Sequence, residues 1–175
     1  MPDKVIKTEQ IFSGRAVKLR VETIEKTNGQ RTTREIIEHA DCIAVVPIDD
    51  KENIVMVKQF REAVGKRLLE IPAGCIEPGE NPVEAVKREL QEEIGYFPEK
   101  VEAIGGFYAT PGYVTEYLYL FKATELKPSR LTAEDTDEIE VVKVPVSQIP
   151  ALIISGEIGD AKSIAGLLRV LYLKK

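Results

Sequence analysis

Three glutamates near the middle of the chain have a spacing that suits metal chemistry. Glu89 precedes Glu92 by three residues and Glu93 by four, so on an α-helix all three would project from one flank. Like charges at this spacing repel one another, at a cost of about 0.2–0.5 kcal/mol for each pair. Carboxylate oxygens are the ligands that hard cations such as Mg²⁺ and Mn²⁺ prefer. The three glutamates are therefore candidate ligands of divalent cations, which would in turn contact phosphate oxygens.

The segment that carries these glutamates has the signals of one helix over residues 82–94. Its apolar residues at helical spacing are Val83, Val86, Leu90 and Ile94. This stripe predicts a face that packs on a core, with the glutamates beside it. Asn81 before Pro82 is typical of a helix start, and Gly95 is typical of a helix end. Arg88 is placed to offset part of the repulsion among the carboxylates.

The glutamates also belong to a longer pattern of glycine, arginine and acidic residues. Gly74 is followed after five residues by Glu80, and after seven more by the run Arg-Glu-Leu-Gln-Glu-Glu-Ile-Gly at residues 88–95. An acidic, solvated helix face would explain the glutamates but not the positions of the glycines and the arginine. The pattern resembles the 23-residue box of the Nudix family, and it departs from that box only at Tyr96, where the family usually has an aliphatic residue.

The resemblance implies a role for each residue of the box. The implied metal ligands are Glu89, Glu92, Glu93 and the backbone carbonyl of Ala73. Arg88 and Glu80 would orient the ligating carboxylates, although ordinary surface ion pairs are an alternative for both. Gly74 would let the backbone approach the helix closely. Two or three Mg²⁺ ions held in this way would bridge a substrate diphosphate and lower the pKa of a bound water.

Segments outside the box resemble the ADP-ribose pyrophosphatase branch of the family. They comprise residues 34–39, 57–61, 69–74 and 106–112, and with them the resemblance spans about residues 15–145. Pro111 follows Tyr96 by fifteen residues, an offset similar to that of the branch, although a Thr-Pro-Gly turn taken alone is ordinary. The implied reaction is the hydrolysis of ADP-ribose to AMP and ribose 5-phosphate.

By the same likeness, residues outside the box would hold the substrate. The candidates are Arg61, Glu70, Arg34, Pro111 and Gly112. Arg61 would bind the phosphates or the adenine side, because a guanidinium donates paired hydrogen bonds to phosphate. Glu70 and Arg34 would help to hold the nucleotide, and Arg34 could reach it from a partner subunit. Surface salt bridges are the alternative for all three charged residues.

An acidic segment at residues 134–140 is the candidate source of the general base. Asp137 and Asp135 align best with an acidic pair in relatives, where glutamates are usual, and Glu138 is offset by one residue. An aspartate side chain is shorter than glutamate, so its carboxylate would have to be brought about 1.5 Å closer to the metals. The assignment therefore stays open among these three residues, and a solvated acidic turn is the alternative.

Several other functions are alternatives. The substrate could be another sugar nucleotide, a dinucleoside polyphosphate or flavin adenine dinucleotide. A non-catalytic nucleotide sensor could use the same fold, although the intact glutamates of the box argue against it. A calcium-binding structural protein would need EF-hand spacing, which the acidic segment lacks. The sequence has no GxxxxGK loop and no serine–histidine or cysteine–histidine arrangement, so neither a kinase nor a covalent hydrolase is predicted.

Composition and charge narrow the class of protein. The 175 residues carry a formal net charge of −5 with a pI near 5.2, which argues against a nucleic-acid partner because such binding needs a basic surface. No apolar run approaches the roughly 20 residues that span a bilayer, and the polar start of the chain lacks a secretory signal. Cys42 and Cys75 are far apart in the sequence, so no disulfide framework or zinc site is predicted. We expect a cytoplasmic protein whose partner is a small nucleotide.

Strand and helix signals predict an α/β fold in two parts. Residues 1–40 are expected to form an antiparallel β arm with a hairpin turn at Asn28 and Gly29. Such an arm has no core of its own, and together with the family likeness it predicts a homodimer. Residues 41–175 would form the catalytic domain, a Nudix-type α/β/α sandwich with a mixed sheet. His39 is the only histidine, and we interpret it as structural.

Apolar runs predict the remaining elements of the second part. Strands are expected at residues 42–48, 54–60, 68–71, 101–108, 117–123 and 138–144. A short helix is expected at residues 148–154, and another from Asp160 onward. The second of these would carry Ile164, Leu167, Leu168 and Leu171 on one apolar face.

Overall fold

The computed structural model of the chain describes residues 3–133 and 138–172, which divide into two compact units. The first unit comprises Met1–Asp41 and Phe107–Tyr117, and the second comprises Cys42–Gly106 and Leu118–Lys175. No helix among the described residues is long and apolar enough to cross a membrane.

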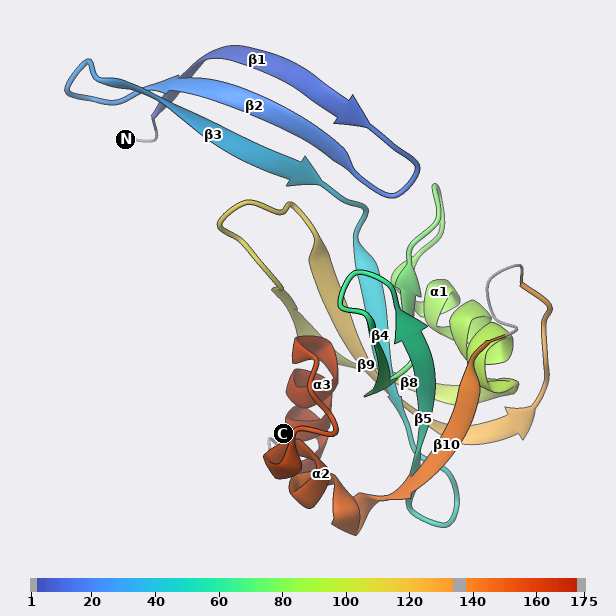
Figure 1. The fold of residues 1–175 in the computed structure, drawn as a ribbon. Coiled ribbons are helices and arrows are strands. Elements are labelled where there is room, and N and C mark those ends of the chain that lie inside the picture. The colour runs from blue at the N-terminus through green and yellow to red at the C-terminus, as the bar shows by residue number, and fades with distance from the viewer. Residues whose placement is uncertain (1–2, 134–137, 173–175) are drawn as a thin grey trace. The chain divides into compact units, whose positions relative to one another are not determined.

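An antiparallel sheet in the order β1-β2-β3 forms the framework of the first unit (Figure 1). Its strands are β1 (Lys4–Ser13), β2 (Lys18–Glu25) and β3 (Arg31–Glu38). The predicted hairpin is confirmed, because β2 and β3 pair over their full length. In the turn, Gly29 has a φ of 80°, which glycine adopts without the steric cost of a Cβ, and the Asn28 side chain accepts a hydrogen bond from the Gln30 N–H at 3.0 Å.

The segment 107–117 completes the first unit beside β3. The Ile37 N–H donates to the Tyr113 carbonyl at 2.8 Å, and the Thr115 N–H donates to the Ile37 carbonyl at 3.0 Å. The predicted turn at residues 110–112 lies within this segment. Backbone hydrogen bonds therefore join the residues that follow the turn to Ile37 of β3.

The strand β1 is exposed to solvent within its own unit. All ten of its residues are exposed. Val5, Ile6, Ile11 and Phe12 are large apolar side chains among them, with 38–58% of their surface exposed. Several exposed apolar side chains on one strand are typical of an interaction surface.

The second unit is built on a sheet in the order β7-β4-β9-β8 and a sheet in the order β10-β5-β6. The strands are β4 (Cys42–Pro47), β5 (Asn53–Arg61), β6 (Lys66–Glu70), β7 (Ala73–Cys75), β8 (Tyr96–Tyr108), β9 (Tyr117–Pro128) and β10 (Glu140–Pro145). β4 pairs parallel with β9 and antiparallel with β7, so this sheet is mixed, as predicted. All six residues of β4 are buried, which places this strand at the centre of the unit.

Helices cover both faces of the β4–β9 sheet (Figure 1). They are α1 (Pro82–Glu89), the π-helix η1 (Leu90–Ile94), the 3₁₀ turn η2 (Val146–Gln148), α2 (Ile149–Ser155) and α3 (Ala161–Tyr172). Ile43 and Val45 of β4 pack in one cluster with Val86 of α1. On the opposite face, a Cβ added to Gly166 of α3 would lie 3.3 Å from the Val46 side chain. Because adjacent strand residues point to opposite faces, this packing makes the predicted α/β/α sandwich.

The predicted helix over residues 82–94 is present, but it changes its winding part-way. α1 ends at Glu89, and the chain continues as the π-helix η1. The side chain of Asn81 accepts hydrogen bonds from two backbone N–H groups of the first turn, each at 3.0 Å. Gly95 ends the helix with a φ of 75°. Both helix ends therefore follow the sequence signals, whereas no sequence signal marked the π-helix that carries Glu92 and Glu93.

The buried face of this helix differs from the predicted face. Val83 is 40% exposed, so its assignment to the apolar stripe was wrong. The buried residues are Ala85, Val86, Glu89, Leu90, Glu93 and Ile94. They form one stripe at helical spacing, so Glu89 and Glu93 lie within the buried face instead of beside it. Hydrophobicity alone misplaces the stripe because it assigns every carboxylate to solvent.

Other element boundaries differ by a few residues from the predicted ones. β8 begins at residue 96 instead of 101, and β9 extends to residue 128 instead of 123. In α3, Leu167 is buried but Leu168 is 38% exposed, so Leu168 does not share the apolar face. Strand ends escape prediction because their exposed residues need not alternate between apolar and polar.

Candidate metal and nucleotide site

Glu93 is a carboxylate in the buried core of the second unit. It is 7% exposed, and its Oε2 accepts a hydrogen bond from the Ala73 backbone N–H at 3.2 Å. Burial raises the pKa of Glu93 to about 8, and the nearby charge of Glu89 adds to this increase. The hydrogen bond from Ala73 and the positive charges of Arg61 and Lys162 act in the opposite direction. They do not offset the effect of burial, so the neutral form of Glu93 is favoured unless further positive charge is placed beside it.

Glu89 lies against the backbone of β7, one turn before Glu93. A Cβ added to Gly74 would lie only 1.9 Å from Glu89 Oε1, so any larger residue at position 74 would displace this carboxylate. Burial raises the pKa of Glu89, although the neighbouring charge of Arg88 opposes the shift. The glycine at position 74 of the box therefore has a steric explanation, because a side chain there would overlap the Glu89 carboxylate.

Arg88 ties the acidic residues of the box together. It donates to both carboxylate oxygens of Glu80 at 2.9 and 3.0 Å, to Glu89 Oε1 at 2.7 Å and to Glu92 Oε2 at 3.1 Å. It also donates to the Cys75 carbonyl at 3.0 Å. The hydrogen bonds from Arg88 lower the pKa of Glu80. These bonds restrain the three carboxylates, and the orienting role that the resemblance implies for Arg88 and Glu80 stays a prediction.

The donor set fits a divalent cation. Two buried carboxylates, Glu89 and Glu93, lie close enough for the charge of one to raise the pKa of the other. Because Gly74 has no Cβ, the Glu89 carboxylate lies against the backbone of β7, and Arg88 donates to Glu92 beside the same group. Oxygen-only donors of this kind suit Mg²⁺ or Mn²⁺. A cation bound between them would stabilise the charged forms that burial disfavours.

A buried ion pair lies next to these carboxylates. Glu70, at the end of β6, is 1% exposed. Arg61, at the end of β5, donates to Glu70 Oε1 through Nε at 3.1 Å and to Oε2 through Nη2 at 2.6 Å. Burial alone would raise the pKa of Glu70, but the hydrogen bonds from Arg61 and the charge of Lys162 hold it below its usual value. The pair is therefore not an ordinary surface salt bridge, because one partner is fully buried.

The start of α3 adds residues to this group that the sequence did not single out. Lys162 Nζ donates to Glu70 Oε2 at 2.6 Å and to Asp160 Oδ1 at 2.9 Å. The buried Ser163 accepts a hydrogen bond from the Ile71 N–H at 2.9 Å through its Oγ. The only available signal was that Asp160 precedes a helix, and nothing in the local sequence pairs Lys162 with a residue 92 positions away.

A profile of the NUDIX domain matches residues 38–167 of the chain. The chain belongs to the NUDIX family. It is 41% identical to an ADP-ribose pyrophosphatase of Bacillus subtilis, in an alignment that covers 100% of this chain and 95% of that protein. It is 40% identical to a methanol dehydrogenase activator of Bacillus methanolicus, over 98% of this chain and 92% of that protein. The predicted family is confirmed.

A solved structure supports the NUDIX fold. The crystal structure of an ADP compounds hydrolase matches with a TM-score of 0.89 and covers 97% of this chain and 92% of that one, at 22% sequence identity. At this level of identity the likeness concerns the fold alone. It confirms the predicted α/β architecture with its N-terminal antiparallel strands.

The other predicted site residues of this NUDIX chain fall into three groups. Arg34, Pro111 and Gly112 belong to the first unit, where Arg34 Nη1 donates to the Thr33 carbonyl at 3.1 Å. Asp135 and Asp137 lie outside the described residues. Glu138 is exposed, just before β10. The substrate-binding roles of the first three residues, and the general-base role of one of the last three, therefore stay predictions.

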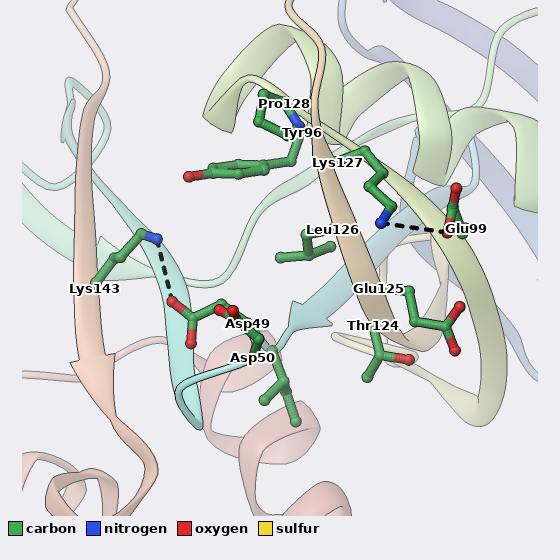
Figure 2. Close-up of a pocket in the computed structure, with 11 residues that line it drawn as sticks. Asp49, Asp50, Tyr96, Glu99, Thr124, Glu125, Leu126, Lys127, Pro128 and Lys143 are labelled. Atoms are coloured by element: carbon green, nitrogen blue, oxygen red, sulfur yellow. Dashed lines mark hydrogen bonds and ion pairs between the residues drawn. The ribbon is translucent and has the colours of Figure 1, made fainter.

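A pocket of about 510 Å³ lies in the second unit and involves none of the glutamates of the box (Figure 2). Its lining includes Asp49, Tyr96 and Lys143. Lys143 Nζ donates to Asp49 Oδ2 at 3.1 Å and lies 5.4 Å from the centre of the Tyr96 ring. Burial alone would raise the pKa of Asp49, but hydrogen bonds from Asn53, Lys143 and a neighbouring N–H lower it to about 2. Two lysines of this pocket are thus paired with acidic residues of its lining, Lys143 with Asp49 and Lys127 with Glu99.

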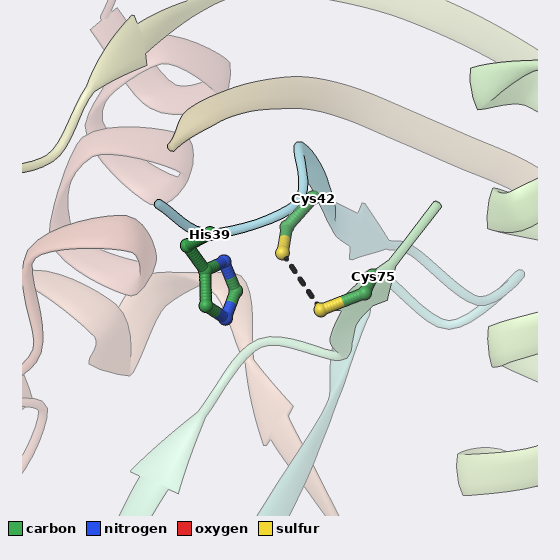
Figure 3. Close-up of side chains that lie close together, drawn as sticks. All are labelled: His39, Cys42 and Cys75. Carbon is green, nitrogen blue, oxygen red and sulfur yellow. Dashed lines mark hydrogen bonds between the residues drawn. The ribbon is translucent and has the colours of Figure 1, made fainter. Parts of the chain in front are cut away.

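The two cysteines, distant in the sequence, lie side by side in the NUDIX fold. Cys42 of β4 and Cys75 of β7 are direct partners across antiparallel strands, and their Sγ atoms are 3.1 Å apart (Figure 3). No disulfide joins these two sulfur atoms in the structure. Sequence separation hid this contact, because the pairing of β4 with β7 brings together residues 33 positions apart.

Proposed function

We propose that this NUDIX protein hydrolyses ADP-ribose to AMP and ribose 5-phosphate in the presence of Mg²⁺, with Mn²⁺ as an alternative ion. The observation that carries the proposal is the buried pair Glu89 and Glu93, packed against Gly74 and Ala73. The choice of ADP-ribose is supported by 41% identity along the whole chain to an ADP-ribose pyrophosphatase. The acidic composition argues against a nucleic-acid partner, and divalent cations would stand between the carboxylates and an anionic nucleotide.

The residues of the box are proposed to hold the metal and the diphosphate together. The ligands would be Glu89, Glu92, Glu93 and the carbonyl oxygen of Ala73. When bound, the divalent cation would offset charge on the phosphate oxygens and supply a water of lowered pKa. Arg88 fixes the orientation of two of these carboxylates through its hydrogen bonds. The chain thereby provides a preorganised set of charges, which is what phosphoryl transfer mainly requires.

Substrate contacts and the general base are proposed on the residues predicted from the sequence. The half-buried guanidinium of Arg61, braced by Glu70, would bind a phosphate of the substrate. Arg34, Pro111 and Gly112 would hold the rest of the nucleotide. Asp137, Asp135 or Glu138 would accept the proton of the attacking water.

A substrate panel tests the choice of ADP-ribose. The purified protein is assayed with Mg²⁺ on ADP-ribose, a sugar nucleotide, a dinucleoside polyphosphate and flavin adenine dinucleotide. We expect the highest kcat/KM for ADP-ribose, with AMP as a product. A higher kcat/KM for one of the other compounds would retain the NUDIX chemistry and reject ADP-ribose as the preferred substrate.

A second candidate function is the regulation of an alcohol dehydrogenase. It is favoured by the 40% identity to the methanol dehydrogenase activator along nearly the whole chain. A regulatory role is compatible with the same fold, because fold alone does not determine function. Stimulation of a methanol dehydrogenase by this protein would support it, and no change in dehydrogenase rate would reject it.

We also propose that the protein is a cytoplasmic homodimer. The exposed apolar side chains of β1 provide a surface that a second copy could cover. The cytoplasmic location rests on the sequence, whose two cysteines are too few for a disulfide framework. Cell fractionation tests the location, and recovery in a membrane or secreted fraction would contradict it.

A further inference from the structure

A hydrogen bond joins the first turn of α3 to the backbone segment between β6 and β7, which leads into the candidate metal site. The Ile71 N–H donates to Ser163 Oγ at 2.9 Å, and both residues are fully buried. Two residues further along, the Ala73 N–H donates to Glu93. A short run of backbone thus connects the first turn of α3 with a predicted metal ligand, so residues of α3 are placed to influence the site.

Lys162 provides a second, charged connection between α3 and this segment. Its Nζ lies 2.6 Å from Glu70 Oε2 and 2.9 Å from Asp160 Oδ1, and its side chain is 17% exposed. Asp160 in turn accepts a hydrogen bond from the Ser163 N–H at 3.1 Å, as a helix cap does. The ammonium group is therefore held between two carboxylates, one of them completely buried.

Glu70 is shared between Lys162 and Arg61. Its Oε2 accepts from Arg61 Nη2 and from Lys162 Nζ, each at 2.6 Å, while its Oε1 accepts from Arg61 Nε at 3.1 Å. These bonds occupy one edge of the Arg61 guanidinium, and this side chain is 40% exposed. A guanidinium fixed along one edge retains N–H groups on the other, which can donate to a phosphate.

We propose that Lys162 is a positioning residue of the active site: it holds the Glu70 carboxylate, which aligns Arg61 to bind a phosphate of the substrate. Without Lys162, Glu70 would have Arg61 as its remaining cationic partner and would be freer to turn with it. The inference rests on the proposed function, because it concerns how the nucleotide substrate is bound. Lys162 itself needs no contact with the substrate.

A double-mutant cycle on binding tests this coupling. The dissociation constant of ADP-ribose is measured by calorimetry for metal-free wild-type protein, Lys162→Met, Arg61→Ala and the double variant. We expect Lys162→Met to weaken binding about tenfold, because the charge-assisted contact between Arg61 and a phosphate would be lost. In the Arg61→Ala background, the same change should alter binding less than about twofold, because Arg61 is no longer there to be aligned. The proposal would be overturned if Lys162→Met weakened binding by the same factor with and without Arg61. It would also be overturned if Lys162→Met bound ADP-ribose as tightly as wild type.

Two further variants separate positioning from general stability. Ser163→Ala removes the hydrogen bond to Ile71 but leaves Lys162 and Glu70 in contact, so we expect a lower melting temperature with nearly unchanged ADP-ribose binding. Lys162→Arg keeps the charge, and we expect binding within about threefold of wild type; it also serves if Lys162→Met does not fold. Equal loss of binding in Ser163→Ala and Lys162→Met would show a merely structural role and reject the proposal.

The kinetic readout distinguishes this inference from the proposed function. With Mg²⁺ present, Lys162→Met should raise KM for ADP-ribose more than it lowers kcat, while Lys143→Met, which also removes an ion-paired lysine, should match wild type. If wild type hydrolyses ADP-ribose and Lys162→Met has the same KM, the inference alone fails. If wild type neither binds nor hydrolyses ADP-ribose, the proposed function fails and the inference falls with it.

Discussion

The carboxyl group of Glu93 shows how burial and charge are balanced at a single residue. It has a hydrogen bond from one backbone N–H and is otherwise in the core, where the charged form is disfavoured. Its raised pKa is thus a consequence of its place on the buried face of η1. A cation at this position would bring the site to its active protonation state.

Replacing Glu93 by glutamine should stabilise the metal-free protein at alkaline pH. The folded-state pKa of about 8 exceeds the ordinary value of 4.5. Stability from the neutral form is therefore fully present below pH 4.5 and is lost as the pH rises through 8. Glutamine stays neutral, so at pH 9 with a chelator we expect Glu93→Gln to melt at least about 3 °C above wild type. Near pH 5 the two proteins should have the same melting temperature. Equal melting temperatures at pH 9 would contradict the account.

Gly74→Ala should disable the site without unfolding the protein. The new Cβ would lie 1.9 Å from Glu89 Oε1, so the carboxylate has to move. We expect kcat/KM to fall about 10- to 100-fold, as when the surroundings of a metal ligand are altered. Gly159→Ala is the matched control, since its Cβ would meet only a carbonyl at 3.3 Å. Comparable activity of the two variants in the same assay would refute the steric role of Gly74.

At the scale of elements, the sequence predicts most of the helix that carries the box. Its ends are marked by Asn81 and Gly95, and both marks are accurate. The set of residues on its buried face is not predicted accurately, because a hydrophobic pattern assigns Glu89 and Glu93 to solvent although both are buried. The contact of Lys162 with Glu70 also escapes prediction, because it depends on how α3 packs against β6.

The pairing of β4 with β7 predicts that Cys42 and Cys75 can be joined by a disulfide. Direct partners on antiparallel strands have Cα atoms about 4.5–5.5 Å apart, which lies within the range for disulfides. On treatment with a mild thiol oxidant such as diamide, we expect both thiols to disappear from titration of the denatured, monomeric chain. A reductant should restore them, and Cys75→Ser should form no intramolecular crosslink. Two titratable thiols after oxidation would show that the strands do not pair in this register.

At the scale of the whole molecule, the order of strands together with the box was sufficient to predict a NUDIX α/β/α sandwich. The mixed sheet follows from apolar runs such as residues 42–48, which are long enough for a central strand buried on both faces. The strand pattern does not identify a binding partner for the exposed side chains of β1. A strand with exposed apolar residues shows that a surface exists, not what binds there.

The proposed homodimer predicts a mass in solution of twice 19.5 kDa, or about 39 kDa. Light scattering at micromolar concentration measures this mass directly. Val5→Lys with Ile11→Lys places charges on the exposed apolar side chains of β1, and we expect this variant to shift toward the monomer. Lys7→Glu, on the same strand, is the control for a change of charge alone. A wild-type mass near 19.5 kDa at all concentrations would exclude the dimer.

The most direct test of the account is the release of AMP from ADP-ribose by the purified protein with Mg²⁺. Wild type is compared with Glu93→Gln, and with Glu84→Gln as a control from the exposed side of the same helix. We expect equal amounts of AMP and ribose 5-phosphate from wild type and Glu84→Gln, a fall of at least about 100-fold in Glu93→Gln, and no product with a chelator present. Undiminished AMP release by Glu93→Gln, or none by wild type, would contradict the account.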